Sequence, residues 1–230
     1  MHRSHRPTDP AVQPPGPDLR VGPFRAEQLP RVGALFAASH ADYPPFRHLF
    51  PDPARRSAVL RAFFTSTVRD ALAVGTVDAA TGGDGQLLGV AVWLPPGAFP
   101  WNARRKLRSL PMLLSVLRTA PGGFPGFARL GANAERLHPH DRHWNLETMG
   151  ITPAAQGQGI GRRLLAPGLG RADTQRLACY LTTAKAENLA FYRRFGFEVE
   201  AGELQLVPGG PPHWAMRRPP APVGEGGELL

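Results

Sequence analysis

The sequence contains a single cysteine, Cys179, so no disulfide can form within the chain. It also lacks any apolar run that approaches the ~20 residues needed to cross a bilayer. The first residues include His, Arg and Pro but no apolar stretch of the kind that a secretory signal requires. We therefore expect a cytoplasmic protein with no membrane partner.

Lysine is scarce as well. Of the 27 basic residues only Lys106 and Lys185 are lysines, and the formal net charge is +9. Because lysine codons are rich in A, this imbalance indicates a GC-rich bacterial genome rather than a binding function. The basic residues are spread along the chain, and one short cluster, residues 104–108, has no interleaved aromatic residues. We expect a solvated helix face there and no nucleic-acid partner.

Composition divides the chain into three parts. Residues 1–17 are rich in proline and poor in apolar residues, so they are expected to form a disordered leader. Residues 18–220 are long enough for one domain with a substantial core, and residues 221–230 are expected to form a flexible tail. Residues 101–141 form an insertion between the third and fourth expected strands.

Hydrophobic periodicity predicts alternating strands and helices. The expected strands are residues 19–25, 74–79, 87–94, 143–151, 177–182, 197–207 and 213–216. The expected helices are residues 27–39, 54–73, 103–118, 124–137, 159–173 and one that begins near Lys185. Pro167, Gly168 and Gly170 predict a kink or a weak point in the helix over residues 159–173.

Glycine gathers at one turn. Residues 156–163, Gln-Gly-Gln-Gly-Ile-Gly-Arg-Arg, follow the strand 143–151 and open a helix. Glycines at such a turn let the backbone approach a ligand, and the free N–H groups of the helix start attract phosphate. The dinucleotide pattern G-x-G-x-x-G fails, because its third glycine would be Arg162 or Leu164, and the Gly-Lys-Ser/Thr of a P-loop is missing. An ordinary glycine-rich turn is the other interpretation.

A second pattern lies downstream at Asn188, Tyr192 and Gly196. In a helix, Asn188 and Tyr192 share a face, while Phe191 and Phe195 form a stripe that packs on the sheet. Gly196 would end this helix. An amphipathic surface helix, in which Asn188 makes only a local hydrogen bond, is the alternative.

Together the two patterns resemble the signatures of the GNAT superfamily of N-acetyltransferases. The first is Gln-x-x-Gly-x-Gly after a strand, and the second is Asn-x-x-x-Tyr followed by Gly-Phe. Over residues 19–219 the chain is similar in particular to the puromycin N-acetyltransferase branch. The segments that carry this narrower resemblance are residues 41–44, 90–93, 143–151 and 213–218.

Two segments depart from that branch. Its members tend to carry Glu-Thr-Ser after the fifth strand, where this chain has Thr182, Thr183 and Ala184. Residues 101–141 do not match residue by residue. Both segments lie where the acceptor is expected to bind, so the resemblance defines the reaction class better than the substrate.

The resemblance implies an α/β fold with a mixed central sheet of six to seven strands flanked by helices, and a helical insertion before the fourth strand. It implies transfer of an acetyl group from acetyl-CoA to a primary amine of a small molecule, by direct attack in a ternary complex. An antibiotic or aminonucleoside acceptor, and hence antibiotic resistance, follows by analogy. Acetylation of protein or peptide amines, and a non-catalytic acyl-CoA sensor, are alternatives. We expect a monomer or a homodimer.

The resemblance also implies which residues form the active site. Tyr192 would protonate the leaving thiolate, and Glu147 is the best local base, although a surface glutamate is an equal interpretation. A backbone N–H near Met149 to Ile151 would stabilise the oxyanion, and the pantetheine arm would pair with that strand edge. The residues expected to hold acetyl-CoA are Met149, Gly150, Ile151, Gln156, Gly157, Gln158, Gly159, Ile160, Gly161, Arg162, Asn188 and Tyr192. Those expected near the acceptor are Asp42, Tyr43, Trp93 and Trp214. Asp42 is also a second candidate for the base.

Three histidines, His138, His140 and His143, stand close together with Asp141 between them. Because they lie in a proline-containing loop and no second cluster matches them, we expect no metal site. Cys179 stands in the middle of an expected strand with no histidine nearby in sequence. We expect it to be a buried core cysteine rather than an acyl-accepting nucleophile.

Overall fold

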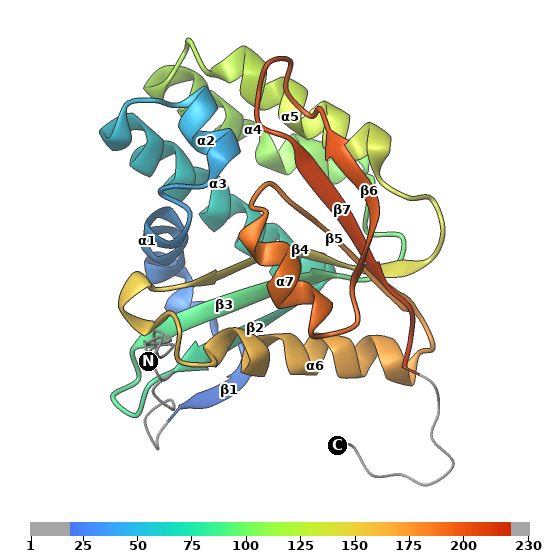
Figure 1. The fold of residues 1–230 in the computed structure, drawn as a ribbon. Helices are drawn as coiled ribbons and strands as arrows, with labels where there is room; N and C mark the ends of the chain where they lie inside the picture. Colours follow the sequence, from blue (N-terminus) through green and yellow to red (C-terminus); the bar gives the residue numbers. More distant parts are fainter. Residues whose placement is uncertain (1–18, 222–230) are drawn as a thin grey trace, which may run out of the picture.

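The structure is a computed structural model that describes residues 19–221 (Figure 1). The expected leader and residues 222–230 of the expected tail lie outside this range. Within it, seven strands form one sheet in the order β1-β2-β3-β4-β5-β7-β6. All neighbours are antiparallel except β4 and β5, which are parallel, so the mixed seven-stranded sheet expected of a GNAT fold is confirmed.

The bounds of the elements follow the sequence pattern closely. The strands are β1 Arg20–Pro23, β2 Thr76–Thr81, β3 Leu87–Leu94, β4 His143–Ile151, β5 Ala178–Thr183, β6 Glu198–Leu204 and β7 His213–Arg218. The α-helices are α1 Leu29–Ser39, α2 Pro44–Leu49, α3 Pro53–Val74, α4 Ala103–Thr119, α5 Phe124–Leu137, α6 Ile160–Thr174 and α7 Glu187–Arg193, with short 3-10 turns at Ala26–Gln28 and Pro153–Ala155. In this part of the chain, no helix is both long and apolar enough to cross a membrane.

Two apolar cores lie on the two faces of the sheet. On one face α1 packs against β3 and β4 and α3 against β2 and β3, and the side chains of Phe36, Phe64 and Val90 are buried there. On the other face α6 runs along the sheet (Figure 1), and Leu165 and Trp144 belong to the same buried cluster. The sheet is thus held between helical layers that each bury an apolar face.

Helices α4 and α5 form the insertion between β3 and β4. They lie together near α2 and α3, at the end of the molecule away from α6 (Figure 1). Val116 of α4 and Phe127 of α5 are buried in the first core, and the rings of Phe127 and Phe63 are perpendicular with centroids 5.4 Å apart. The insertion is therefore part of the main core rather than an appended segment.

The sequence pattern does not predict α2, and the kink or weak point that it predicts in α6 does not interrupt this helix. Pro44 is the first residue of α2, a position where proline's missing N–H is not needed. Helix α6 continues through Pro167 from Ile160 to Thr174. Its buried leucines on one side anchor it to the sheet, and this tertiary packing outweighs the local preference.

Trp93 is fully buried beneath α6, which corrects its expected place near the acceptor. Its relative exposure is 0%, and it belongs to the core between the sheet and α6. Gly168 lies directly against its indole, so that any Cβ at this position would overlap the ring. The glycine that the sequence marks as a weak point is thus the place where the helix crosses Trp93.

We expect Gly168→Ala to destabilise the fold by about 1–3 kcal/mol, the usual range for overpacking a core. Gly170→Ala is the matched control, because it lies in the same helix and a Cβ there meets nothing within 4 Å. The control should be neutral or stabilising by up to about 1 kcal/mol, since alanine favours helix more than glycine. Chemical denaturation measures both. Equal stabilities would contradict the packing of α6 on Trp93.

Candidate active site

The parallel pairing of β4 with β5 is short. It joins His143–Asn145 to Ala178–Tyr180, although β4 continues to Ile151 and β5 to Thr183. Beyond Asn145, the edge of β4 that faces β5 has no strand partner among residues 19–221. The two strands therefore separate and leave a gap in the middle of the sheet.

A bulge in β4 marks the place where the strands separate. In the pairing with β3, Trp93 is opposite Leu146 while its neighbour Val92 is opposite Thr148, which leaves Glu147 as an extra residue. A bulge of this kind bends the strand and redirects a side chain. Glu147 is the side chain redirected here.

The free edge of β4 offers backbone groups to the gap. The N–H of Thr152 donates to a β3 carbonyl at 2.8 Å, which fixes the phase of the antiparallel ladder. Since residues in such a ladder alternate between the two edges, Met149 and Ile151 direct their N–H and C=O groups away from β3. The Ile151 carbonyl accepts a hydrogen bond from Gln156 Nε2 at 3.1 Å. The N–H of Ile151 and the N–H and C=O groups of Met149 are thus left for an extended ligand.

The turn after β4 is shaped by two glycines in the left-handed region. The φ angles of Gly157 and Gly159 are 77° and 76°, values that other residues rarely adopt. The backbone N–H groups of residues 157–162 donate to no acceptor within residues 19–221. Several adjacent free donors at the start of α6, beside the exposed Arg162, form a site suited to phosphate.

Gly161 is buried and faces α7 rather than a ligand. A Cβ at this position would lie 3.1 Å from Phe191 Cζ and 3.4 Å from Ile151 Cδ1. Gly161 can still offer its N–H to a phosphate, but a side chain here would push α7 away. A side chain at this position would therefore contact Phe191 and Ile151 rather than project into the phosphate site.

Tyr192 lies on the buried side of α7, with a relative exposure of 8%. Burial raises the pKa of its phenol, and the nearby Tyr43 raises it further. A phenol of this kind keeps its proton at neutral pH and can donate it to a thiolate. One turn earlier, Asn188 Nδ2 donates to Thr183 Oγ1 at 3.0 Å, which ties the start of α7 to the end of β5.

Tyr43 contacts the same end of β5 from the other side. Its hydroxyl oxygen accepts the N–H of Ala184 at 2.7 Å, and burial raises the pKa of the phenol. Trp214 of β7 is the register partner of Thr183, so it stands at this end of β5 as well. Asp42 is exposed on the turn between α1 and α2. These positions leave Tyr43 and Trp214 as the better placed of the expected acceptor residues.

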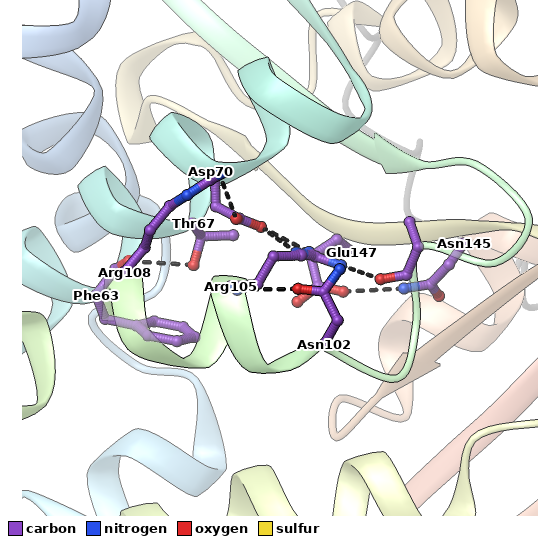
Figure 2. A network of polar contacts seen from close by, with 9 residues as sticks. Phe63, Thr67, Asp70, Asn102, Arg105, Arg108, Asn145 and Glu147 are labelled. Atoms are coloured by element: carbon purple, nitrogen blue, oxygen red, sulfur yellow. Dashed lines mark hydrogen bonds and ion pairs between the residues drawn. The ribbon is translucent and has the colours of Figure 1, made fainter. Parts of the chain in front are cut away.

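Glu147 is half-buried on the side of β4 that faces α3 and α4, and its Oε2 accepts a hydrogen bond from Asn145 Nδ2 at 2.9 Å (Figure 2). Burial is the main factor that raises the pKa of its carboxyl; Arg105 lowers the pKa, Asp70 raises it, and the Asn145 hydrogen bond lowers it. A carboxylate with a raised pKa is a stronger base near neutral pH.

The histidine cluster is occupied by internal contacts. The Nε2 atoms of His138 and His143 are 2.9 Å apart, and His143 Nδ1 donates to the Asp141 carbonyl at 2.8 Å. Both carboxylate oxygens of Asp141 accept from Arg217 at 2.9 Å. Burial lowers the pKa of His138 to about 4, so the two rings are neutral and one proton lies between their Nε2 atoms. Over residues 19–221, no group of three or more His, Cys, Asp or Glu is arranged to hold a metal.

Sequence reasoning does not predict Arg105, Asp70 or Thr183 as part of the site. Arg105 belongs to the basic cluster 104–108, which is predicted to be a solvated helix face, yet its relative exposure is 3%. The one available signal is its spacing from Ser109 and Val116, the other buried residues of α4, which lie four and eleven positions later. That spacing places all three on one face of a helix.

The chain is similar to known acetyltransferases. Residues 115–199 match the family model of the acetyltransferase (GNAT) domain. A segment of 76 residues, 33% of this chain, is 38% identical to the N-alpha-acetyltransferase RimI of Mycobacterium tuberculosis, and this match spans 44% of that relative's length.

Two solved structures extend the similarity to most of the chain. A protein from Corynebacterium glutamicum, described as histone acetyltransferase HPA2 and related acetyltransferase, is 27% identical with a TM-score of 0.68, over 90% of this chain and 99% of that one. Arylalkylamine N-acetyltransferase 2 from Aedes aegypti shares the fold at 14% identity, with a TM-score of 0.57 over 87% and 98% of the two chains.

Residues 115–199 thus resemble the GNAT acetyltransferase domain, a kind of domain that uses acetyl-CoA, and the described chain has the fold of these acetyltransferases. The narrower resemblance to the puromycin N-acetyltransferase branch stays a prediction.

We expect Gly159→Asp to weaken acetyl-CoA binding roughly tenfold or more, about 1.4 kcal/mol, because a carboxylate would stand beside the free N–H groups. Gly85→Asp is the matched control. Gly85 has the same φ of 76° and the same empty surroundings, but it lies in the turn between β2 and β3. Isothermal titration compares the two folded variants. Wild-type affinity in Gly159→Asp would exclude this turn as the phosphate site.

Proposed function

We propose that this protein transfers the acetyl group of acetyl-CoA to a primary amine by direct attack within a ternary complex. The observation that supports this most is the gap between β4 and β5. It has the free N–H groups of residues 157–162 at one end and Tyr192 beside it. No other strand pair in the described sheet ends so far before its strands do.

The donor would lie along the gap. Its diphosphate would accept hydrogen bonds from residues 157–162, with Arg162 adding charge. The pantetheine arm would pair with the Met149 edge as an added strand, while Asn188 holds its other side. The Met149 N–H would then polarise the thioester carbonyl as negative charge develops on its oxygen.

The chemistry requires a base and an acid. Glu147 takes a proton from the acceptor ammonium, and the neutral amine nitrogen attacks the thioester carbonyl carbon. The C–N bond forms, the C–S bond breaks, and the excess proton on nitrogen is lost to water. The thiolate takes a proton from the Tyr192 phenol. Solvent then returns a proton to the phenol and takes the proton from Glu147. The products are an N-acetyl amine and free CoA.

A small-molecule acceptor fits the surroundings of Glu147. The carboxyl is half-buried on the side of β4 that faces α3 and α4. A base with limited exposure suits a small amine, such as an antibiotic or aminonucleoside, better than a folded protein surface. A bacterial, cytoplasmic role in antibiotic resistance, by a monomer or homodimer, belongs to the same proposal.

Acetylation of a protein or peptide amine is the second candidate. The similarity over 76 residues to RimI, which is described as an N-alpha-acetyltransferase, favours this candidate. Release of CoA with a panel of small amines, puromycin included, and with peptides that carry a free N-terminus separates the two. We expect faster turnover of small amines. Faster turnover of peptides would overturn the small-molecule assignment, and acetyl-CoA binding without any turnover would indicate a sensor.

Tyr192→Phe should lower kcat by roughly 10²-fold or more while acetyl-CoA affinity changes little, since the ring stays and only the proton donor is lost. The loss should shrink with an acyl donor whose thiol has a lower pKa, because that thiolate needs less protonation. Tyr180→Phe, a buried tyrosine on β5 packed against His138, is the matched control. Wild-type kcat in Tyr192→Phe, with chemistry rate-limiting, would remove Tyr192 as the acid.

Cys179→Ala should keep most of the wild-type activity. The side chain is fully buried, and burial raises the pKa of its thiol to about 12, so almost no thiolate is present at neutral pH. Mass spectrometry after incubation with acetyl-CoA alone should show no stoichiometric acetyl group on the protein. An adduct on Cys179 together with ping-pong kinetics would contradict direct transfer.

A further inference from the structure

The helical insertion places a buried arginine beside Glu147. Helix α4 is capped by Asn102, whose side-chain oxygen accepts the backbone N–H of Arg105 at 3.0 Å. Arg105 has a relative exposure of 3%, and its guanidinium stands over the Trp101 ring, 4.7 Å from the centroid. A charge this well buried has a large desolvation cost and needs partners.

Every nitrogen of the Arg105 guanidinium has an acceptor (Figure 2). Nε and Nη2 donate to Oδ2 of Asp70 at 2.9 and 2.6 Å, and Nη1 donates to the carbonyl of Ala98. These bonds join α4 to α3 and to the segment after β3. Because the guanidinium is a rigid planar fork, they hold its charge in one place.

Only one carboxylate oxygen of Asp70, Oδ2, accepts hydrogen bonds from Arg105. Its Oδ1 is buried without a hydrogen-bond partner in the part of the chain that the structure describes, and Arg108 Nη1 is 4.0 Å from it. A buried acceptor without a partner costs on the order of 1–3 kcal/mol. A pair that only joined two helices would have no reason to retain this cost.

Glu147 is the group that faces this pair. The side chains come from α3, α4 and β4 and gather in one place (Figure 2). Arg105 opposes the rise that burial gives to the pKa of Glu147, and Asp70 adds to that rise. Among the described residues, the hydrogen bond to Glu147 comes from Asn145 and none comes from Arg105. The Arg105 guanidinium is thus near the Glu147 carboxyl, but its hydrogen bonds all go to other groups.

We propose that Arg105 and Asp70 are positioning residues for Glu147. Asp70 keeps the guanidinium from pairing directly with Glu147, and the guanidinium favours the ionised carboxyl that accepts the proton of the amine. This inference rests on the proposed function, in which Glu147 is the base. It also makes the insertion part of the active site, since α4 supplies the cation.

Other titratable groups stand on the elements around Glu147. These groups include Arg56 of α3, Arg108 of α4, His143 of β4, Cys179 and Tyr180 of β5, and His40 directly after α1, whereas β3 has none. Among the described residues, the charged side chains that shift the pKa of Glu147 are Arg105 and Asp70. Changing each of these two therefore tests the proposal directly.

The experiment is a titration of the Glu147 carboxyl by ¹³C NMR, with the signal assigned through Glu147→Gln. Arg105→Met removes the cation and should raise the pKa of Glu147. Asp70→Asn keeps the shape and removes the negative charge, so it should lower that pKa. If the two residues only held the helices together, both variants would let water reach Glu147, and its pKa would fall in both.

Two further variants serve as a control and as a substitute for a variant that does not fold. Asp173→Asn is the matched control, because it removes the acid of the Arg218–Asp173 pair at the end of α6, and it should leave Glu147 unchanged. If Arg105→Met alone does not fold, the double variant Arg105→Met/Asp70→Asn removes both charges together. Its Glu147 pKa should then lie above that of Asp70→Asn.

Opposite shifts support the proposal; shifts in one direction, or no shift in either variant, overturn it. The titration needs no substrate, so this result is independent of the proposed function. The base role is tested separately by the pH profile of kcat/KM, which falls as pH drops through the pKa of Glu147. Its acid limb should move to higher pH in Arg105→Met and to lower pH in Asp70→Asn. Opposite NMR shifts with an unmoved limb would support the charge pair and overturn Glu147 as the base.

Discussion

The rest of the structure depends on the early end of hydrogen bonding between β4 and β5. Backbone N–H and C=O groups are rarely left without partners inside a protein, so an unpaired edge in the centre of a sheet needs a ligand or water. The bulge at Glu147 bends β4 away, and α7 begins soon after β5 ends. Both strands thereby bring functional groups to one gap, which a continuous sheet would fill with its own hydrogen bonds.

The two sides of β4 differ in chemistry because side chains alternate along a strand. Leu146 belongs to the core under α6, the cluster that also contains Tyr192. Glu147 lies toward α3 and α4, where Arg105 and Asp70 are buried. In the proposed function, this alternation places the acid, Tyr192, and the base, Glu147, on opposite sides of β4. The donor and the acceptor would then approach the reacting atoms from different sides of the strand.

Much of the fold follows from the sequence, since long periodic segments and the glycine-rich turn specify β4, α4, α5 and α6 to within a residue or two. The predictions that fail are those that depend on tertiary contacts. The sequence suggests Trp93 as a ligand contact, but α6 buries it, and the sequence does not show that the side-chain position of Gly161 faces Phe191. Arg105 lies in a run of charges, and only packing against α3 shows that it is buried. Local patterns indicate which residues are special but not which partner makes them so.

The central claim is that acetyl-CoA occupies the gap between β4 and β5. Amide hydrogen exchange with and without saturating acetyl-CoA tests it most directly, because the claim concerns backbone N–H groups. We expect new protection at residues 157–162 and along the free edge of β4 at Met149 and Ile151, with little change in β6 and β7. Protection that appears elsewhere while these residues still exchange freely would contradict the account.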